Sequence, residues 1–297
     1  MEIDSLRPFS KSVIRDFENE LEQLLFKTGI YFRLFSRIKS VDSLKCKILQ
    51  KREKKDVSYK IKDLIGFRIV LYFKEDIKIC ENLLFNQYKK IEEHVDKPDE
   101  KEFSPQRINY TFEIPERFSN IIPHNYLNYA KNTFEVQLRT IFSEGWHEVE
   151  HDLRYKCKDK WEKYKDDSRT LNGILATLEN CDWAISKIFD ELAYKNFKNN
   201  EWSEMIKNKF RVHLESEGLS NKIINLLNTD STLGKKIYKA NRYSILMTIQ
   251  EHSLPLVYDN LFYLILLQEK INVNIDIPKT LQSYFTKDEN KKEDNLS

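Results

Sequence analysis

The segment from 133 to 140 alternates between apolar and polar side chains and then passes into a helical pattern. The apolar members are Phe134, Val136 and Leu138, and the polar members are Glu135, Gln137 and Arg139. This period of two predicts a strand with one buried face. From Ile141 onward the apolar spacing becomes helical, and Thr140 or Ser143 can cap the first turn. The segment therefore places polar groups on one strand face, directly before a helix that carries Glu150 and His151.

Charged groups on a sheet surface need partners, a ligand or water. A solvated outer face is one interpretation of Glu135, Gln137 and Arg139, because outward polar faces are common in antiparallel sheets. A binding surface is the other interpretation. It requires that further polar groups elsewhere in the chain converge on this strand.

Composition indicates a soluble globular protein that is not directed to a membrane. Of 297 residues, 40% are hydrophobic and 32% are charged, which is too apolar for a disordered chain. The 49 basic and 47 acidic residues nearly balance, so net charge favours no particular partner. Neither a signal peptide nor an apolar run long enough to span a bilayer is found. We therefore expect a cytoplasmic protein.

The 4 cysteines lie far apart. Their spacing matches neither a structural zinc site nor the disulfide framework of a small secreted protein. We expect reduced, mostly buried thiols.

The first part of the chain mixes helical and strand patterns. Helices are predicted at 12–28, from about 40 to 52, at 74–85 and from 141, and strands at 30–35, 62–73, 88–95, 106–114 and 133–140. Beyond 166 the strand patterns stop, and helical periodicity covers 168–197, 201–215, 221–227, 233–251 and 257–268. We predict an α+β domain over 1–165, a helical domain over 166–285 and a charged, disordered tail over 286–297.

A basic segment precedes and enters the second predicted helix. Arg37 and Lys39 alternate just before a helix that Ser40 or Asp42 can cap. Cations aimed to one side before a helix N-terminus suit phosphate. A solvated lysine-rich helix face is the alternative.

A lone acid, Asp63, introduces the long apolar strand pattern, and Arg68 follows 5 positions later. The pair is interpreted either as a turn residue with its ion-pair partner or as a metal ligand with a phosphate clamp.

The string His147-Glu148-Val149-Glu150-His151 satisfies the H-E-x-x-H pattern of zinc peptidases, in which a helix presents two histidines and a catalytic glutamate. The pattern is short, and no convincing third ligand follows it. We therefore disfavour a metalloprotease.

Four blocks in order resemble the RelA/SpoT-type nucleotide pyrophosphokinases, the synthetases of (p)ppGpp. The blocks are Ser36-Arg37-Ile38-Lys39-Ser40 with Ser43 and Lys47, then Asp63-Leu64-Ile65-Gly66-Phe67-Arg68-Ile69, then Phe134 to Thr140, and then Trp146 through Glu150-His151-Asp152 to Tyr155-Lys156. They span about 36–156, roughly the first half of the chain. The resemblance also accounts for the zinc-like string, since an acidic, histidine-containing helix after this strand belongs to the family pattern.

The resemblance implies a role for each matching residue. Asp63 and Glu135 are implied to be catalytic and to bind Mg²⁺, and Glu135 also to take the proton of the acceptor's 3′-hydroxyl. The residues implied to bind ATP are Arg37, Lys39, Ser43, Lys47, Arg68 and Glu150. Those assigned to the acceptor are Gln137, Arg139, Arg107, Asn109 and His151.

The acceptor side departs from the family pattern. Family synthetases carry a Gly-Tyr-x-x-x-His element whose tyrosine stacks on the acceptor base, whereas here Ser104-Pro105 takes the Gly-Tyr place and Asn109 the His place. Arg107 is a candidate for stacking on a base or holding an acceptor phosphate, and a surface arginine on an edge strand is the alternative.

We predict a mixed sheet of about five strands with flanking helices, like the nucleotidyltransferase fold of that family, followed by a helical region. The predicted reaction is Mg²⁺-dependent transfer of pyrophosphate from ATP to the 3′-hydroxyl of GDP or GTP, giving a (p)ppGpp-type alarmone and AMP. The alternatives are pyrophosphorylation of the tRNA 3′ end and a catalytically weak, nucleotide-binding regulator. The sequence leaves homo-oligomerisation and the role of the helical half open.

Overall fold

The structure is a computed structural model and describes residues 3, 6–53, 58–95, 108–154 and 157–283. The chain divides into two compact units, one of residues up to 25 together with 32–184, the other of 26–31 together with 185 onward. The boundary falls within the long helix α6, Lys165–Lys198. The division at 165 stays a prediction, and the predicted tail at 286–297 lies outside the described residues.

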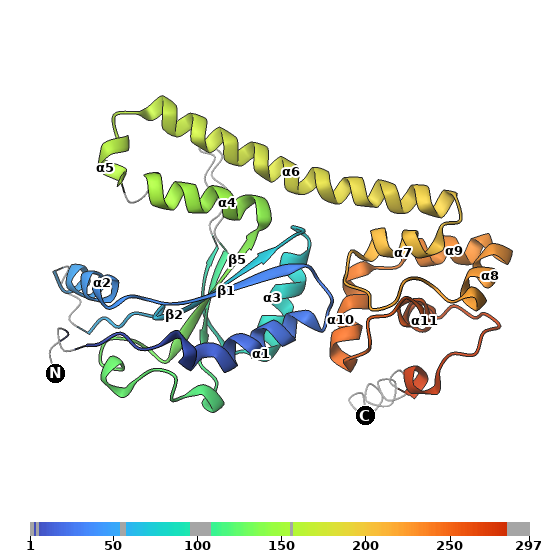
Figure 1. The fold of residues 1–297 in the computed structure, drawn as a ribbon, viewed down its shortest axis with the longest axis horizontal. Coiled ribbons are helices and arrows are strands. Elements are labelled where there is room, and N and C mark those ends of the chain that lie inside the picture. The colour runs from blue at the N-terminus through green and yellow to red at the C-terminus, as the bar shows by residue number, and fades with distance from the viewer. Residues whose placement is uncertain (1–2, 4–5, 54–57, 96–107, 155–156, 284–297) are drawn as a thin grey trace, which may run out of the picture. The chain divides into compact units, whose positions relative to one another are not determined.

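A five-stranded mixed sheet organises the first unit (Figure 1). Its order is β1-β2-β5-β4-β3, with β2 and β5 parallel and the other neighbours antiparallel. The strands are β1 Phe32–Ile38, β2 Ile65–Leu71, β3 Lys90–Val95, β4 Ile108–Glu113 and β5 Thr133–Thr140. The predicted α+β class and mixed sheet are therefore confirmed.

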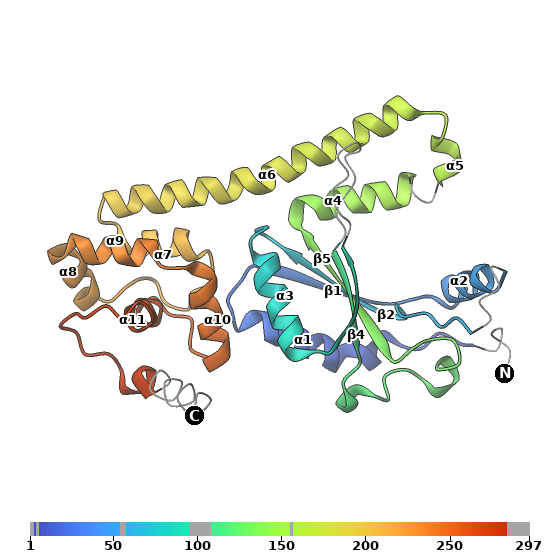
Figure 2. The same ribbon diagram turned by 180° about the vertical axis from the view of Figure 1, so that it is seen from behind.

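Helices flank this sheet on both faces (Figure 2). The helices of the first unit are α1 Arg15–Phe26, α2 Val41–Glu53, α3 Asp76–Gln87, α4 Ile141–Val149, α5 Lys158–Trp161 and the first part of α6. Short 3-10 helices cover Lys11–Ile14, Glu116–Phe118 and His124–Tyr126, and a π-helical turn, Glu150–Arg154, continues α4.

Aromatic side chains fill the core between the sheet and the helices α1 and α3. Phe17 of α1 contacts Phe67 of β2 and Phe134 of β5, with ring centroids 5.1 and 4.7 Å apart. Phe134 in turn stacks on Phe112 of β4 at 5.4 Å. These phenylalanines are fully buried. Burial of rings from neighbouring strands on one side fixes the strand registers, because a slip of one residue would turn the rings to the other face.

The opposite face of the sheet is polar as a consequence. Glu135 of β5 lies between Gly66 of β2 and Thr111 of β4. Gln137 lies between Arg68 and Asn109 in the next row. The alternation predicted for β5 is confirmed, and it places the polar groups of three strands side by side.

The second unit is helical in its described residues. Its elements are the end of α6, α7 Trp202–Phe210, α8 Asn221–Thr229, α9 Ser231–Lys239, α10 Arg242–His252 and α11 Tyr258–Gln268. The single helix predicted at 233–251 is wrong. The helix α9 ends before Ala240. Oδ1 of Asn241 then accepts a hydrogen bond from Ser244 N at 3.0 Å and caps the start of α10.

Gly29 follows the end of α1, and its backbone N–H donates to the carbonyl oxygen of Phe26 at 2.9 Å. Its φ of +70° lies in the left-handed region, and a Cβ there would stand 2.7 Å from Cδ1 of Leu256. Both conditions require glycine. No helix among the described residues combines the length and apolarity that a membrane crossing needs.

Candidate active site

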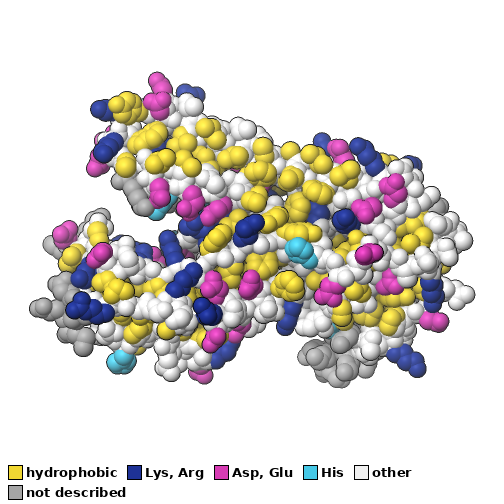
Figure 3. All heavy atoms as spheres, in the orientation of Figure 1, with side chains coloured by type: hydrophobic (Ala, Val, Ile, Leu, Met, Phe, Trp, Pro, Cys, Tyr) yellow, Lys and Arg dark blue, Asp and Glu magenta, His cyan; other side chains and the backbone are white. Residues whose placement is uncertain are grey.

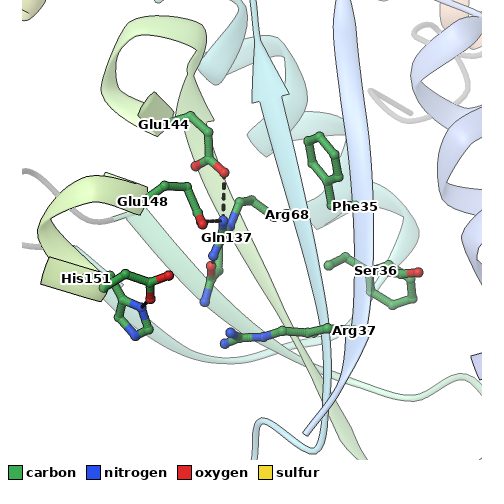
Figure 4. Close-up of a pocket in the computed structure, with 11 residues that line it drawn as sticks. Phe35, Ser36, Arg37, Arg68, Gln137, Glu144, Glu148 and His151 are labelled. Carbon is green, nitrogen blue, oxygen red and sulfur yellow. Dashed lines mark hydrogen bonds and ion pairs between the residues drawn. The ribbon is translucent and has the colours of Figure 1, made fainter. Parts of the chain in front are cut away.

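A cavity of about 580 Å³ opens on the polar face of the sheet, beneath α4. Its lining includes Phe35, Ser36, Arg37, Arg68, Gln137, Glu144, Glu148, His151 and Asp152. Figure 4 shows Arg37 reaching from β1 toward His151, and Arg68 held between β2 and the helix. Figure 3 shows the same side of the first unit as a hollow with acidic and basic side chains on facing rims.

Gly66 leaves room for the side chain of Arg37 to extend across β2. The two residues are paired between β1 and β2, and a Cβ on Gly66 would lie 3.4 Å from Nε of Arg37. Because Gly66 has no side chain, the arginine passes over β2 into the cavity.

Arg68, Gln137 and Glu135 are linked by hydrogen bonds. Nε of Arg68 donates to Oε1 of Gln137 at 3.2 Å, and Nε2 of Gln137 donates to Oε2 of Glu135 at 2.7 Å. Glu135 itself does not line the cavity, but it is one hydrogen bond away from a residue that does. Its carboxylate is thus oriented at the edge of the cavity.

Two acids of α4 share Nη1 of Arg68. Glu144 accepts from it through Oε1 at 2.7 Å, and Glu148 accepts through its own Oε1. Burial acts to lower the pKa of Arg68, but the hydrogen bonds and charges of Glu144 and Glu148 outweigh it and raise that pKa. The two glutamates carry more formal negative charge than the one arginine carries positive charge. Together they therefore disfavour the binding of a phosphate at Arg68.

The second group of predicted ATP ligands surrounds Asp63. Its carboxylate lies 2.8 Å from Nζ of Lys39 and 3.0 Å from Nζ of Lys47. Burial acts to raise the pKa of Asp63, but the hydrogen bonds and charges of these lysines outweigh it and lower the pKa. Ser43 lies at the start of α2, where its backbone N–H donates to Oγ of Ser40 at 3.2 Å.

The helix that carries the cavity acids begins with a capping box. Oγ1 of Thr140 accepts from Ser143 N at 3.2 Å, and Thr140 N donates to Oγ of Ser143 at 2.9 Å. Oγ1 of Thr140 also donates to Oδ2 of the buried Asp182 on α6 at 2.7 Å. Nε1 of Trp146 donates to the carbonyl oxygen of Leu171 at 2.9 Å. These contacts fix α4 against the first part of α6.

A π-helical turn, Glu150–Arg154, follows Val149, and Glu150 does not line the cavity. Glu150 is 7% exposed and accepts from Arg154 at 3.4 Å. His151 lines the cavity and lies 3.0 Å from Asp152 through Nδ1. Of these two predicted ligands, the structure therefore places only His151 at the cavity, and the nucleotide contact of Glu150 stays a prediction.

The predicted acceptor residues are dispersed. Arg139 is 7% exposed and donates to the carbonyl oxygen of Leu138 at 2.7 Å and to Oδ1 of Asn109 at 3.1 Å. The contact with Asn109 links β5 to β4 within the sheet. Gln137 is at the cavity, and Arg107 lies outside the described residues.

Two carboxylates are available for a divalent cation. Asp63 precedes β2 and Glu135 lies near the start of the parallel β5, so they come from the same end of the strand pair. No group of three or more potential metal ligands occurs among the described residues. Mg²⁺ commonly binds through one or two carboxylates together with substrate phosphates, and this donor set fits that chemistry.

The two α4 glutamates that line the cavity were not predicted from the sequence. Glu144 and Glu148 are one helical turn apart, and that spacing alone places both on one face of α4. Phe35 alternates with Arg37 on β1, which puts it on the same face of the sheet. The signals were present, but the pairing with Arg68 depends on how α4 packs.

Comparison with known proteins identifies one matching family. The family model described as "Region found in RelA / SpoT proteins" matches residues 36–160. Comparison with the curated proteins gives no match.

Several solved structures are similar to the chain. Small alarmone synthetase 2 from Bacillus subtilis is 22% identical, with 61% of this chain and 95% of that chain covered and a TM-score of 0.47. Small alarmone synthetase 1 from Bacillus subtilis, bound to its product pppGpp, is 20% identical, with 62% and 94% covered and a TM-score of 0.45. A GTP pyrophosphokinase family protein from Streptococcus pneumoniae is 19% identical, with 61% and 89% covered and a TM-score of 0.45.

The family match begins in β1 and extends through α4 and the π turn into α5, so it includes every residue that lines the cavity except Phe35. Residues 36–160 of this chain thus form a region of the RelA/SpoT type.

Proposed function

We propose that this protein transfers pyrophosphate from ATP to the 3′-hydroxyl of a guanine nucleotide, GDP or GTP, and releases AMP. The observation that carries the proposal is the position of Glu135. Its carboxylate is held by Gln137 at the edge of a cavity that also contains Arg37, within a region of the RelA/SpoT type. A carboxylate held in this way suits a general base, and an arginine beside it suits a phosphate.

The reaction joins the acceptor's 3′-oxygen to the β-phosphorus of ATP. The bond between that phosphorus and the α,β-bridging oxygen breaks, and AMP leaves. Glu135 takes the proton of the 3′-hydroxyl as the new bond forms. The guanidinium of Arg37 is always charged and offers several donors, so it binds and orients phosphate oxygens.

Lys39 and Lys47 complete the proposed phosphate site. Both lie against Asp63, which keeps two ammonium groups near the start of β2, next to the end of β1 that carries Arg37. Mg²⁺, when bound by Asp63 and Glu135, would offset phosphate charge. Lys39 and Lys47 would bind phosphate oxygens through their ammonium groups.

Transfer of label tests the proposal directly. Purified protein is incubated with γ-³²P-labelled ATP and Mg²⁺, with GDP, GTP, other nucleotides and deacylated tRNA in parallel reactions. We expect label on GDP or GTP with release of AMP. Label on tRNA alone would replace the acceptor with the tRNA 3′ end, and no transfer to any acceptor would overturn the proposed activity.

Glu135→Gln is the decisive variant, because it removes the negative charge and the base while keeping an acceptor for Gln137. We expect kcat to fall by about 10²- to 10⁴-fold, the usual contribution of a general base, with ATP binding retained. Glu113→Gln is the matched control, since Glu113 is a half-buried carboxylate at the end of β4 that pairs with Lys89 and lies outside the cavity lining. Full turnover in Glu135→Gln would exclude the assigned base.

A further inference from the structure

The polar face of the sheet contains one unbroken sequence of contacts from α4 to Glu135. Glu144 binds Arg68 at 2.7 Å, Arg68 binds Gln137 at 3.2 Å, and Gln137 binds Glu135 at 2.7 Å. The last three residues lie on adjacent strands, whereas Glu144 comes from the helix that covers them.

The direction of these hydrogen bonds is determined by their donors. A guanidinium only donates, so the Gln137 amide must present its oxygen to Arg68 and its NH₂ group to Glu135. If Arg68 moved, the amide of Gln137 would lose the partner that fixes its orientation. The carboxylate of Glu135 would then have no directed donor from Gln137.

Glu144 and Glu148 hold Arg68 unequally. The side chain of Glu144 is 16% exposed and that of Glu148 is 56% exposed, although both contact the same nitrogen. Exposed ion pairs contribute little, because water and salt screen them. Loss of one partner of a shielded pair costs more, so Glu144 is the stronger restraint on Arg68.

We propose that Glu144 is a positioning residue, which orients the base Glu135 through Arg68 and Gln137. The inference rests on the proposed function and assigns Arg68 a different role from phosphate binding. The pairing with two acids occupies the guanidinium on the α4 side, and its Nε is directed at Gln137. The position of α4 is thereby linked to the orientation of the carboxylate that takes the proton.

Steady-state kinetics of the full chain separate positioning from binding. We expect Glu144→Gln to lower kcat about tenfold, and Glu144→Ala up to about a hundredfold, since small displacements of a reacting group cost that much. The KM for ATP and the affinity for ATP stay near the wild-type values. Glu148→Gln should lower kcat less than Glu144→Gln, and Glu162→Gln, on an exposed residue before α6, is the neutral control.

A double-mutant cycle tests whether Glu144 acts through Gln137. Gln137→Ala removes the link, so adding Glu144→Ala to it should lower kcat no further. Additive losses would overturn the proposal. A raised KM for ATP with unchanged kcat in Glu144→Gln would also overturn it, because Glu144 would then be a binding residue.

Nuclear magnetic resonance provides a readout that does not depend on turnover. In protein labelled with ¹⁵N-glutamine, the side-chain amide signal of Gln137 is assigned by its absence in Gln137→Ala. We expect Glu144→Gln and Glu144→Ala to shift or broaden this signal, with the backbone spectrum showing that both variants are folded. An unchanged signal would overturn the relay. If the wild type transfers pyrophosphate to no acceptor, the proposed function fails, and this measurement still decides the positioning role.

Discussion

Gly66 lies opposite Arg37 in the β1–β2 ladder, and a Cβ on Gly66 would already be in contact with the arginine side chain, 3.4 Å from its Nε. Gly66→Val adds a branched side chain that displaces Arg37 from the cavity, while valine itself suits a strand. We expect nucleotide affinity to fall about tenfold, or roughly 1.4 kcal/mol, by direct titration with ATP. Gly66→Ala should give a smaller loss, since its Cβ would only reach contact distance. Equal affinities in all three proteins would show that the course of Arg37 over Gly66 does not matter for binding.

Arg37→Ala should weaken ATP binding more than it slows turnover at saturating ATP. The reason is that a guanidinium contacting phosphate in both ground and transition states contributes mainly to binding. Arg33→Ala is the matched control, because Arg33 is exposed on the same strand and face, opposite Val70, and is not in the cavity lining. Calorimetry with ATP on both variants distinguishes the two positions. Similar affinities for them would contradict the assignment of Arg37.

The strand at 133–140 was predictable because the alternation of its side chains and the burial of its apolar residues give the same result. Alternation sets the faces of β5, and the burial of Phe134, Val136 and Leu138 leaves Glu135 and Gln137 on the polar side. Local spacing was therefore enough to predict which residues of β5 share a face. It was not enough to predict the partners of the polar side chains, because the contact of Arg68 with Glu144 joins residues 76 positions apart through the packing of α4.

Helix ends were less predictable than helices. Apolar periodicity continues through 233–251, but Asn241 provides a cap that begins a new helix after Ala240. Prediction from periodicity assumes that the helix continues as long as the apolar spacing does. The prediction of one helix over 233–251 was wrong because α9 ends before this cap and α10 begins after it.

Thr140→Ala should destabilise the first unit by about 1–2 kcal/mol, since it removes the capping hydroxyl of α4. The same change leaves Oδ2 of Asp182 without its donor. Thr140→Ser keeps the hydroxyl and should restore most of the loss. Urea unfolding followed by circular dichroism measures the difference. A loss in Thr140→Ser as large as that in Thr140→Ala would mean that the methyl group, not the cap, is responsible.

Asp182 should make the free energy of unfolding fall as pH rises, because its pKa is raised in the folded protein. Burial raises the pKa of its carboxyl above the ordinary 3.8, although the hydrogen bond from Thr140 and the charge of Lys74 act to lower it. Between the ordinary and the raised pKa, the folded chain keeps a proton that the unfolded chain has released. The contribution of this group to stability is therefore complete below 3.8 and is lost as pH rises through the folded pKa.

Asp182→Asn tests this dependence, because asparagine stays neutral and keeps an acceptor for Thr140. We expect the free energy of unfolding of the variant, relative to wild type, to rise as pH increases from about 4 to 7, since only the wild type must bury a charge there. Denaturant unfolding at a series of pH values gives this difference. Glu179→Gln is the control for the nearby charge, because Glu179 acts to raise the same pKa without contacting Thr140. A difference between Asp182→Asn and wild type that is constant with pH would show that Asp182 is ionised in the folded protein throughout this range.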